Sequence, residues 1–132
     1  NLSFKIEENQ AKIECKNLPK IRAEFSQMVQ LFQNLISNAL KFRSEKPPVI
    51  KIKAEENFAE YRFSISDNGI GISPENQDQV FDIFKRLHSR QSYEGTGIGL
   101  SVCKKIVENL GGNIWVKSTQ GVGSTFYFTI PK

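Results

Sequence analysis

The chain has 132 residues, a length typical of one domain built around one hydrophobic core. Hydrophobic residues make up 39% of the sequence and prolines number only five, which argues against a disordered protein. The formal net charge of +4 is mild, and the lysines and arginines form no run of the kind that binds DNA or RNA, so nucleic acid is not an expected partner. We therefore predict a single domain over residues 1–132 whose basic excess serves a local anionic ligand.

Neither the cysteines nor the apolar segments indicate a metal cluster or a membrane span. Cys15 and Cys103 lie far apart, and neither has a second cysteine or a histidine at a metal-ligand spacing. Both are expected to be reduced thiols of a cytoplasmic protein. No apolar run approaches the roughly 18 residues of a membrane helix, and no signal peptide opens the chain. Because the chain starts at Asn1 rather than at methionine, we expect a domain excised from a longer parent, either soluble or membrane-anchored, and monomeric in isolation.

The N-terminal part of the chain predicts a hairpin followed by a long helix. Alternating apolar residues in 2–8 and 11–17 indicate two short strands joined at Asn9 and Gln10. Residues 30–43 then predict an amphipathic helix. Its apolar stripe, which we expect to face the core, consists of Phe25, Met28, Val29, Phe32, Leu35, Ile36, Ala39 and Leu40.

The opposite face of this helix is unusual because it carries no carboxylate. Asn34 and Asn38 are one turn apart and point the same way, and Lys41 follows on the next turn. Such a row of amide and cationic groups suits a metal-complexed polyphosphate. The alternative is that the asparagines are weak helix formers on a solvated face. The whole polar face consists of Gln27, Gln30, Asn34, Ser37, Asn38 and Lys41.

The remainder of the chain predicts paired strands and two further helices. Ser73 and Pro74 have the residue types preferred at a helix N-cap and first helical position. A second helix is predicted from Ile98 to the stop signal Gly111-Gly112. The polar tract 85–99 between the helices is predicted to be a mobile loop. Strands are predicted over 49–55, 60–66, 113–118 and 124–130. In the helix that is predicted to start at Pro74, the apolar positions are Val80, Phe81, Ile83, Phe84 and Leu87.

This order of elements predicts an α+β fold, a two-layer α/β sandwich with a mixed, mostly antiparallel sheet and helices on one face. Asp67 continues the inward face of the strand 60–66, where a buried carboxylate needs a hydrogen-bond donor or water. Glycine clusters occur at 67–71, 95–100 and 121–123. The middle cluster precedes a helix and so suits a phosphate, although its spacing is neither a Rossmann fingerprint nor a P-loop. For the last cluster, a plain turn is at least as good an interpretation.

Five motifs together resemble a known family. NLISNALKF, DNGIGI, VFDIFKRL, GTGIGL and GVGSTF follow the order of the N, G1, F, G2 and G3 boxes of the catalytic and ATP-binding domain of sensor histidine kinases, in the GHKL superfamily. The resemblance covers about residues 22–132. The end of the lid and the strand GGNIWV are similar to kinases fused to phytochrome-like or other cytosolic sensor modules. The resemblance implies a Bergerat-type ATP-binding fold with a flexible ATP lid, and ATP and Mg²⁺ as cofactors.

The resemblance also implies the residues that hold the nucleotide. Asp67 would accept a hydrogen bond from the adenine 6-amino group with Ser124 in its polar network, and Asn38 would ligate Mg²⁺. The purine would pack against Phe42, Ile72, Leu100 and Phe126. The expected nucleotide-binding residues are Asn34, Asn38, Lys41, Phe42, Asp67, Gly69, Gly71, Ile72, Arg90, Thr96, Gly97, Ile98, Gly99, Leu100 and Ser124.

Among these, some would act on the phosphates. Asn34 and Lys41, with Arg43, would face them, Gly97 and Gly99 would hold them at the helix start, and Arg86 and Arg90 would close over the γ-phosphate. The residues expected to be catalytic are Asn34, Lys41 and Arg86.

Position 34 distinguishes branches of the family. Relatives that hydrolyse ATP, or that phosphorylate serine, carry glutamate there as a general base. A carboxamide cannot take a proton from water, so the resemblance implies phosphoryl transfer to a histidine and slow hydrolysis by the isolated chain. His88, the only histidine, lacks the acidic neighbour and downstream proline of an acceptor site.

The acceptor is expected on dimerisation and phosphoacceptor helices of the same parent protein, N-terminal to residue 1. The downstream partner would be a response-regulator receiver domain of a two-component system. Two alternatives stay open: a nucleotide-gated interaction module that binds ATP without transfer, and a water-activating ATPase.

Overall fold

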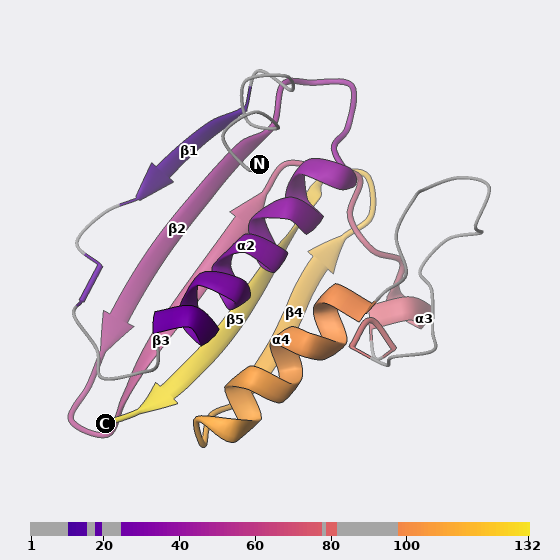
Figure 1. The fold of residues 1–132 in the computed structure, drawn as a ribbon. Helices are drawn as coiled ribbons and strands as arrows, with labels where there is room; N and C mark the ends of the chain where they lie inside the picture. Colours follow the sequence, from indigo (N-terminus) through magenta and orange to yellow (C-terminus); the bar gives the residue numbers. More distant parts are fainter. Residues whose placement is uncertain (1–10, 16–17, 20–24, 78, 82–97) are drawn as a thin grey trace.

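The computed structural model describes residues 11–15, 18–19, 25–77, 79–81 and 98–132. Figure 1 shows their arrangement as one sheet crossed by two long helices. The elements are β1 (Lys12–Cys15), α2 (Phe25–Lys41), β2 (Val49–Glu56), β3 (Glu60–Asp67), α3 (Pro74–Gln77), α4 (Ile98–Asn109), β4 (Ile114–Thr119) and β5 (Gly123–Pro131).

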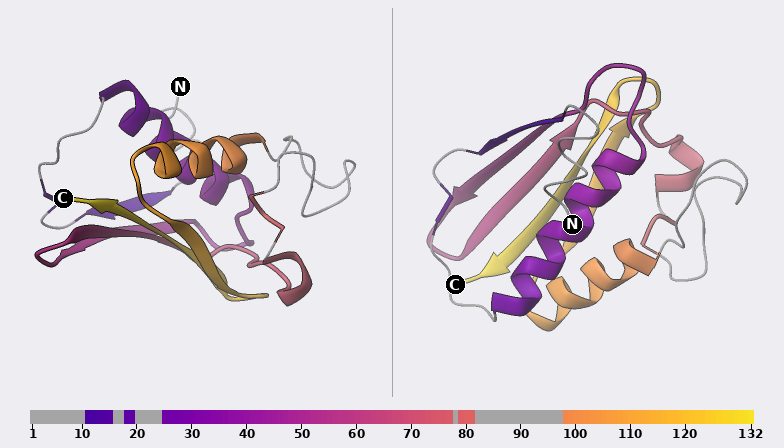
Figure 2. Two further views of the ribbon diagram at one scale, coloured as in Figure 1. Left: turned by 90° about the horizontal axis from the view of Figure 1, so that it is seen from below. Right: turned by 45° about the horizontal axis from the view of Figure 1, so that its top comes forward.

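The described strands form a single sheet in the order β1-β2-β3-β5-β4. β1 and β2 run parallel, and all other neighbours are antiparallel. Helices α2 and α4 pack against each other and lie on the same face of the sheet, as the side view in Figure 2 shows. The predicted two-layer sandwich with a mixed, mostly antiparallel sheet is confirmed. No helix in the described part of the chain is long and apolar enough to cross a membrane.

The strand predicted in 11–17 is confirmed, and its partner among the described strands is β2, which the sequence did not indicate. β1 pairs in parallel with β2, so that Ile13 lies opposite Ile50. Parallel neighbours need a long crossover, which α2 provides. Apolar alternation identifies a strand without identifying its partner, so the sequence did not predict this pairing. The other half of the predicted hairpin, 2–8, lies outside the described residues.

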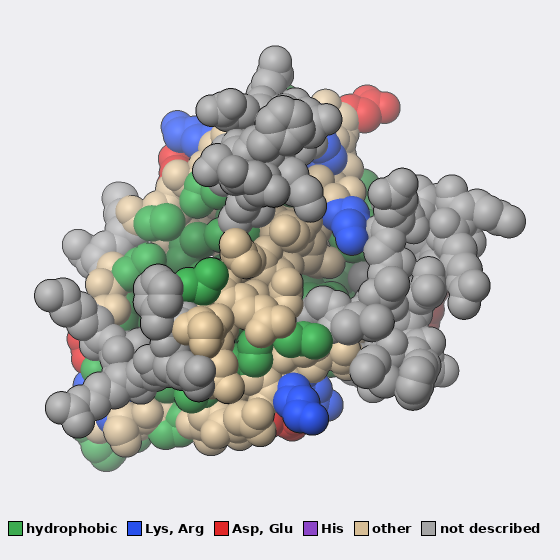
Figure 3. All heavy atoms as spheres, viewed as in Figure 1, with side chains coloured by type: hydrophobic (Ala, Val, Ile, Leu, Met, Phe, Trp, Pro, Cys, Tyr) green, Lys and Arg blue, Asp and Glu red, His purple; other side chains and the backbone are tan. Residues whose placement is uncertain are grey.

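The helix-covered face carries scattered charges. Figure 3 shows separate groups of Lys and Arg side chains on the described part of this face, some of them with an Asp or Glu side chain beside them. Lys41, Lys104 and Lys105 are exposed on the two long helices. The described part of this surface shows no continuous basic strip.

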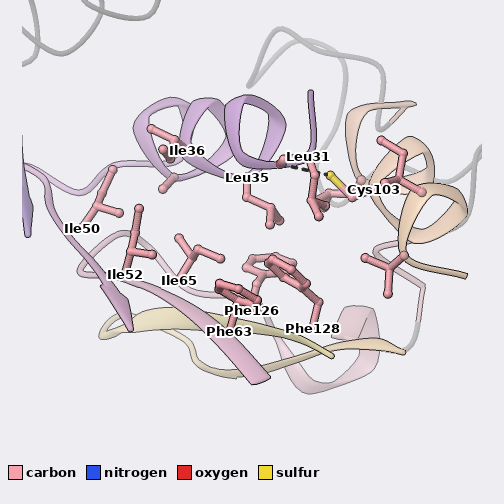
Figure 4. Packing of buried hydrophobic residues seen from close by; sticks show 14 of the residues in the cluster. Leu31, Leu35, Ile36, Ile50, Ile52, Phe63, Ile65, Cys103, Phe126 and Phe128 are labelled. Atoms are coloured by element: carbon pink, nitrogen blue, oxygen red, sulfur yellow. Dashed lines mark hydrogen bonds between the residues drawn. The ribbon is translucent and has the colours of Figure 1, made fainter. Parts of the chain in front are cut away.

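Aromatic rings fill the centre of the core. Phe63 and Phe128 are cross-strand neighbours whose rings stack with centroids 4.9 Å apart, and Phe32 of α2 meets them edge-on at 5.9 and 5.6 Å. Figure 4 shows residues of α2 pointing down onto these rings. The buried residues of α2 are Leu31, Leu35, Ile36, Ala39 and Leu40.

Among the side chains that the structure describes, which exclude that of Phe25, the predicted apolar stripe of α2 is correct except at Val29. Val29 is 37% exposed, whereas Leu31, which the prediction omitted, is completely buried. Leu31 stands one turn before Leu35 and two before Ala39, and so belongs to the centre of the stripe. Val29 is at the edge of the stripe, where helical periodicity alone does not decide burial.

The end of α4 agrees with the predicted stop. Gly111 has φ +87°, and its N–H donates to the carbonyl of Glu108 at 3.0 Å. The N–H of Gly112 donates to the carbonyl of Val107 at 2.9 Å. These two bonds form a Schellman motif, in which glycine accepts the left-handed conformation.

The helix that was predicted to start at Pro74 is shorter than expected. α3 comprises only Pro74–Gln77, and a turn follows it over 79–81. Val80 is 3% exposed, and the Phe81 ring meets Phe126 edge-on at 6.0 Å, so this turn still contributes to the core. The remaining predicted apolar positions, Ile83, Phe84 and Leu87, and the loop from residue 85 to 97 lie outside the described residues.

The open face of the sheet carries an aromatic pair. Trp115 and Tyr127 are cross-strand neighbours whose rings stack with centroids 5.4 Å apart. The guanidinium of Arg62 lies 5.7 Å from the Trp115 ring, and the ammonium of Lys117 lies 5.7 Å from the Tyr127 ring. Because side chains alternate along β5, Tyr127 faces away from the core that its neighbours Phe126 and Phe128 enter.

Replacement of Phe128 by alanine tests the core. The Phe128 side chain is completely buried, so Phe128→Ala should lower the free energy of unfolding by about 3–5 kcal/mol. Phe58→Ala is the matched control, because Phe58 is 96% exposed and its loss should change the free energy of unfolding by less than about 0.5 kcal/mol. Urea denaturation followed by circular dichroism measures both, and equal losses would contradict this core.

Candidate functional site

One row of the inner face of the sheet is polar. Asp67 of β3 pairs with Ser124 of β5, and Ser124 pairs with Ser118 of β4. The next inward-facing row across the same three strands is entirely apolar and consists of Ile65, Phe126 and Val116. The polar row therefore marks the end of the hydrophobic core, where the loop after β3 begins.

Asp67 is fixed by backbone donors on one side only. Its Oδ1 accepts hydrogen bonds from the N–H of Gly69 at 2.9 Å and of Ser124 at 3.3 Å. Burial raises the pKa of Asp67 above its usual value, and the two backbone hydrogen bonds oppose this shift without cancelling it. Within the described part of the chain, no donor contacts the second oxygen, Oδ2. Asp67 thus offers an oriented, partly desolvated acceptor to a ligand.

The loop after Asp67 is held from two sides. The N–H of Ile70 donates to the carbonyl of Phe42 at the end of α2, at 3.0 Å. The carbonyl of Ile70 accepts from the N–H of Gly121 in the β4–β5 turn, at 2.7 Å. At Gly69, a Cβ would lie 2.4 Å from the carbonyl oxygen of Phe42, so the loop approaches the helix end more closely than a side chain permits.

Two further glycines permit the contact between this loop and the β4–β5 turn. Gly71 has φ +74°, and a Cβ there would lie 2.3 Å from the carbonyl oxygen of Thr119. Gly123 has φ +150°, and a Cβ there would lie 2.1 Å from the carbonyl oxygen of Asp67. Gly123 is therefore required by packing and is more than the plain turn residue that the sequence allowed. Gly121 has open space around its Cα, which agrees with a turn role.

Ser118 and Gln77, neither of which is among the predicted site residues, join the loop to the sheet. The Ser118 hydroxyl accepts from the N–H of Ile72 at 2.7 Å, donates to the carbonyl of Gly123 at 2.9 Å, and lies 2.7 Å from the Ser124 hydroxyl. The Gln77 amide donates to the carbonyls of Ile72 and Ser118, both at 3.0 Å. Ser118 had a signal, because it continues the inward face of an apolar strand as Asp67 does.

Asn68 is a third residue whose role was missed. Its Oδ1 accepts from the N–H of Val49 at 2.9 Å, and its Nδ2 donates to the carbonyl of Pro47 at 3.2 Å. The Ser44 hydroxyl donates to the Asn68 carbonyl at 3.3 Å. Asn68 therefore fixes the segment between α2 and β2 against the glycine loop.

The amide residues of α2 lie beside α4. Asn34 and Asn38 are half-buried, and Lys41 is exposed in the last turn. The Asn34 carboxamide contacts the thiol of Cys103 in α4, whose Sγ also donates to the Leu31 carbonyl at 3.8 Å (Figure 4). Burial raises the pKa of Cys103 to about 12, although the hydrogen bond from Asn34 opposes the shift. This thiol is thus a neutral contact that orients Asn34.

Several predicted site residues belong to the core. Ile72, Leu100 and Phe126 are 5%, 5% and 2% exposed, whereas Phe42 is half-buried. The guanidinium of Arg43 donates to the carbonyls of Ser44 and Lys46, each at 3.3 Å. The other predicted residues either start α4, as Ile98 and Gly99 do, or lie outside the described residues, which is the case for Arg86, His88, Arg90, Thr96 and Gly97.

The sequence and the fold were compared with those of known proteins. Residues 23–132 match the family described as histidine kinase-, DNA gyrase B-, and HSP90-like ATPase. Cyanobacterial phytochrome A of Nostoc sp. is 55% identical over 131 residues, which are 99% of this chain and 17% of that protein. The chain therefore spans less than a fifth of this relative.

Solved structures agree with this match. The catalytic domain of the histidine kinase ThkA, in a nucleotide-free form, superimposes with a TM-score of 0.80 at 31% identity, over 99% of this chain and 86% of that one. Full-length ShkA in complex with AMPPNP gives a TM-score of 0.82 at 26% identity, over 98% of this chain and 27% of that one.

The raised pKa of Asp67 predicts a pH-dependent stability. The folded state binds the Asp67 proton more tightly than the unfolded state, so the contribution of Asp67 to stability falls as the pH rises from the ordinary aspartate pKa of 3.8 through the raised pKa. Asp67→Asn removes this dependence and keeps an Oδ1 acceptor. The variant should be more stable than the wild type at pH 7, and this advantage should vanish in acid. Urea denaturation across the pH range measures it, and an advantage of the wild type that grows with pH would contradict the assignment.

Proposed function

The chain belongs to the histidine kinase-, DNA gyrase B-, and HSP90-like ATPase family, and we propose that it binds Mg·ATP and transfers the γ-phosphoryl group to a histidine on a separate dimerisation helix of a parent sensor kinase. The observation that carries this proposal is the oriented Asp67 carboxylate at the end of an otherwise apolar sheet face. The similarity to a cyanobacterial phytochrome supports a phytochrome-like parent that acts in two-component signalling, with a response-regulator receiver domain as its downstream partner.

Adenine recognition follows from the chemistry of Asp67. Oδ1 accepts from two backbone N–H groups, so Oδ2 is left as an acceptor for a ligand. An adenine 6-amino group donates to such an oxygen, whereas a 6-oxo purine presents an acceptor there. Partial burial strengthens this discrimination, because an unsatisfied charge is more costly in a less polar environment. In this proposal Ser124 completes the base site and Phe42 contacts the purine.

The polar face of α2 fits a magnesium-bound polyphosphate. The described residues contain no cluster of three or more His, Cys, Asp or Glu that forms a metal cage. Mg²⁺ bound with ATP needs few protein ligands, so the amide oxygen of Asn38 suffices. When bound, Mg²⁺ neutralises charge on the phosphate oxygens. Lys41 would add a cation, and Gly97, Gly99, Thr96, Arg86 and Arg90 would complete the phosphate site.

Asn34 favours transfer over hydrolysis. Its carboxamide has no basic group that takes a proton from water, and its contact with the neutral Cys103 thiol supplies none. An acceptor histidine carries its own nucleophilic nitrogen and needs no such base. ThkA is described as a histidine kinase, which supports transfer to histidine, and ShkA is described in complex with AMPPNP, which supports binding of ATP.

A labelling experiment tests the proposed function. The chain is combined with the dimerisation helices of its parent and ATP labelled at the γ-phosphate, and acid-labile, base-stable phosphohistidine is measured. We expect label on the helices and slow phosphate release by the chain alone. ATP binding without phosphohistidine would favour the nucleotide-gated interaction module. Rapid phosphate release by the isolated chain would favour a water-activating ATPase.

Asp67→Asn should weaken Mg·ATP binding by about 10- to 100-fold, because a hydrogen bond to a charged acceptor contributes about 1.5–3 kcal/mol. Isothermal titration calorimetry measures the affinity. The matched control is Glu55→Gln, which makes the same chemical change at an exposed position of β2 and should leave the affinity unchanged. Unchanged affinity in the Asp67 variant would show that the adenine assignment is wrong.

Asn38→Asp should still hold Mg²⁺ but adds an anion near the phosphates. We expect phosphohistidine formation at saturating Mg·ATP to slow by about tenfold or more, since tenfold corresponds to about 1.4 kcal/mol. Asn57→Asp is the control, because Asn57 is an exposed turn residue whose Oδ1 accepts from the N–H groups of Ala59 and Glu60, as a carboxylate also does. A wild-type rate in the Asn38 variant would argue against its role at the metal.

A further inference from the structure

The hydroxyl of Ser118 has a determined hydrogen-bond polarity. A serine hydroxyl has one proton and two lone pairs. The N–H of Ile72 is only a donor and takes one lone pair of Ser118, while the carbonyl of Gly123 is only an acceptor and takes the proton. The Ser124 hydroxyl, 2.7 Å away, therefore contacts the second lone pair of Ser118. Ser124 must therefore be the donor in this contact.

This polarity determines what Ser124 offers to a ligand. Ser124 is 7% exposed and has one hydroxyl proton, which the contact with Ser118 uses. Toward every other group its oxygen presents only lone pairs. Ser124 is also the cross-strand neighbour of Asp67, and its N–H holds the Oδ1 of that carboxylate. The end of the sheet thus presents two neighbouring groups that accept and do not donate.

We propose that Ser118 is a positioning residue that makes Ser124 an obligate acceptor and so contributes to the selection of adenine over 6-oxo purines. This inference rests on the proposed function. The adenine 6-amino group has two protons to donate, whereas hypoxanthine and guanine carry an oxygen at that position. If Ser118 is removed, the proton of Ser124 is released, and Ser124 can donate to a 6-oxo group. Ser118 does not touch the base; it acts through Ser124.

The experiment compares ATP with inosine triphosphate, which differs from ATP only in having a 6-oxo purine. Isothermal titration calorimetry with Mg²⁺ gives the ratio of the two affinities for the wild type, Ser118→Ala, Ser124→Ala and the double variant. We expect Ser118→Ala to lower the preference for ATP by about five- to tenfold, the scale of one hydrogen bond. The double variant should have the same ratio as Ser124→Ala alone, because Ser118 acts through Ser124.

Two further variants separate this role from a general loss of structure. Ser66→Ala breaks a similar contact between two hydroxyls, since the Ser66 Oγ lies 3.0 Å from the Thr125 Oγ1, one residue along the same two strands and on the opposite face. Its affinity ratio should equal that of the wild type. Ser118→Thr keeps the hydroxyl and should retain the preference for ATP. If Ser118→Ala does not fold, Ser118→Cys replaces it, because a thiol has a similar size but is a weak hydrogen-bond partner.

The outcomes distinguish this inference from the proposed function. Binding of ATP by the wild type with an unchanged affinity ratio in Ser118→Ala and Ser118→Cys would overturn the role of Ser118 alone. The role of Ser118 would also be overturned if the double variant showed the sum of the changes that Ser118→Ala and Ser124→Ala each cause in the affinity ratio. No ATP binding by the folded wild type would overturn the proposed function together with this inference. A lower ratio in Ser118→Ala or Ser118→Cys, with wild-type ratios in Ser118→Thr and Ser66→Ala, supports the inference.

Discussion

The register between β3 and β5 is the constraint on which the site depends. It places Ile65 opposite Phe126 and Phe63 opposite Phe128, so that four large apolar side chains point into the core. The same register sets Asp67 opposite Ser124 one row further on. A slip of one residue would turn Asp67 to the open face. Burial of the apolar rows therefore positions the polar row, and the hydrophobic core determines where the carboxylate stands.

The structure stabilises this carboxylate incompletely. Two backbone N–H groups hold one of its oxygens, yet burial still raises its pKa. If further donors compensated fully for the burial of the Asp67 carboxylate, no oxygen would remain to accept a hydrogen bond from a ligand. A site of this kind is less favourable when empty and becomes more favourable when a ligand supplies the missing donor, so some stability is given up for binding. The glycine loop makes this arrangement possible, because the lack of a side chain at Gly69 and Gly71 permits the close approach, and the backbone hydrogen bonds of Ile70 hold the loop there.

Sequence patterns predicted the elements better than their partners. Apolar alternation correctly indicated the strands from β2 to β5, and Gly111 correctly indicated the end of α4. The parallel pairing of β1 was not predictable, because alternation describes the faces of a strand and carries no information on its neighbour. Similarly, the burial of Leu31 in place of Val29 depends on how α2 is rotated against α4 and the sheet.

The same limit applies to the site. Asp67 was recognisable as a carboxylate at the end of an apolar pattern, and its backbone donors agree with that interpretation. The contact between Asn34 and Cys103 depends on the packing of two helices that are distant in sequence, so no local pattern indicates it. Ser118 had the same positional signal as Asp67, but a serine at a strand end has many uses. Only its three hydrogen-bond partners define its role.

The aromatic pair on the open face of the sheet has a practical consequence. Trp115 is the only tryptophan of the chain, and it stacks on Tyr127 on the side opposite the polar row of Asp67, Ser124 and Ser118. Its fluorescence therefore reports the integrity of the β4–β5 hairpin and is separated by the thickness of the sheet from any bound base. The chain thus contains an intrinsic optical probe of folding that is largely insensitive to occupancy of the site.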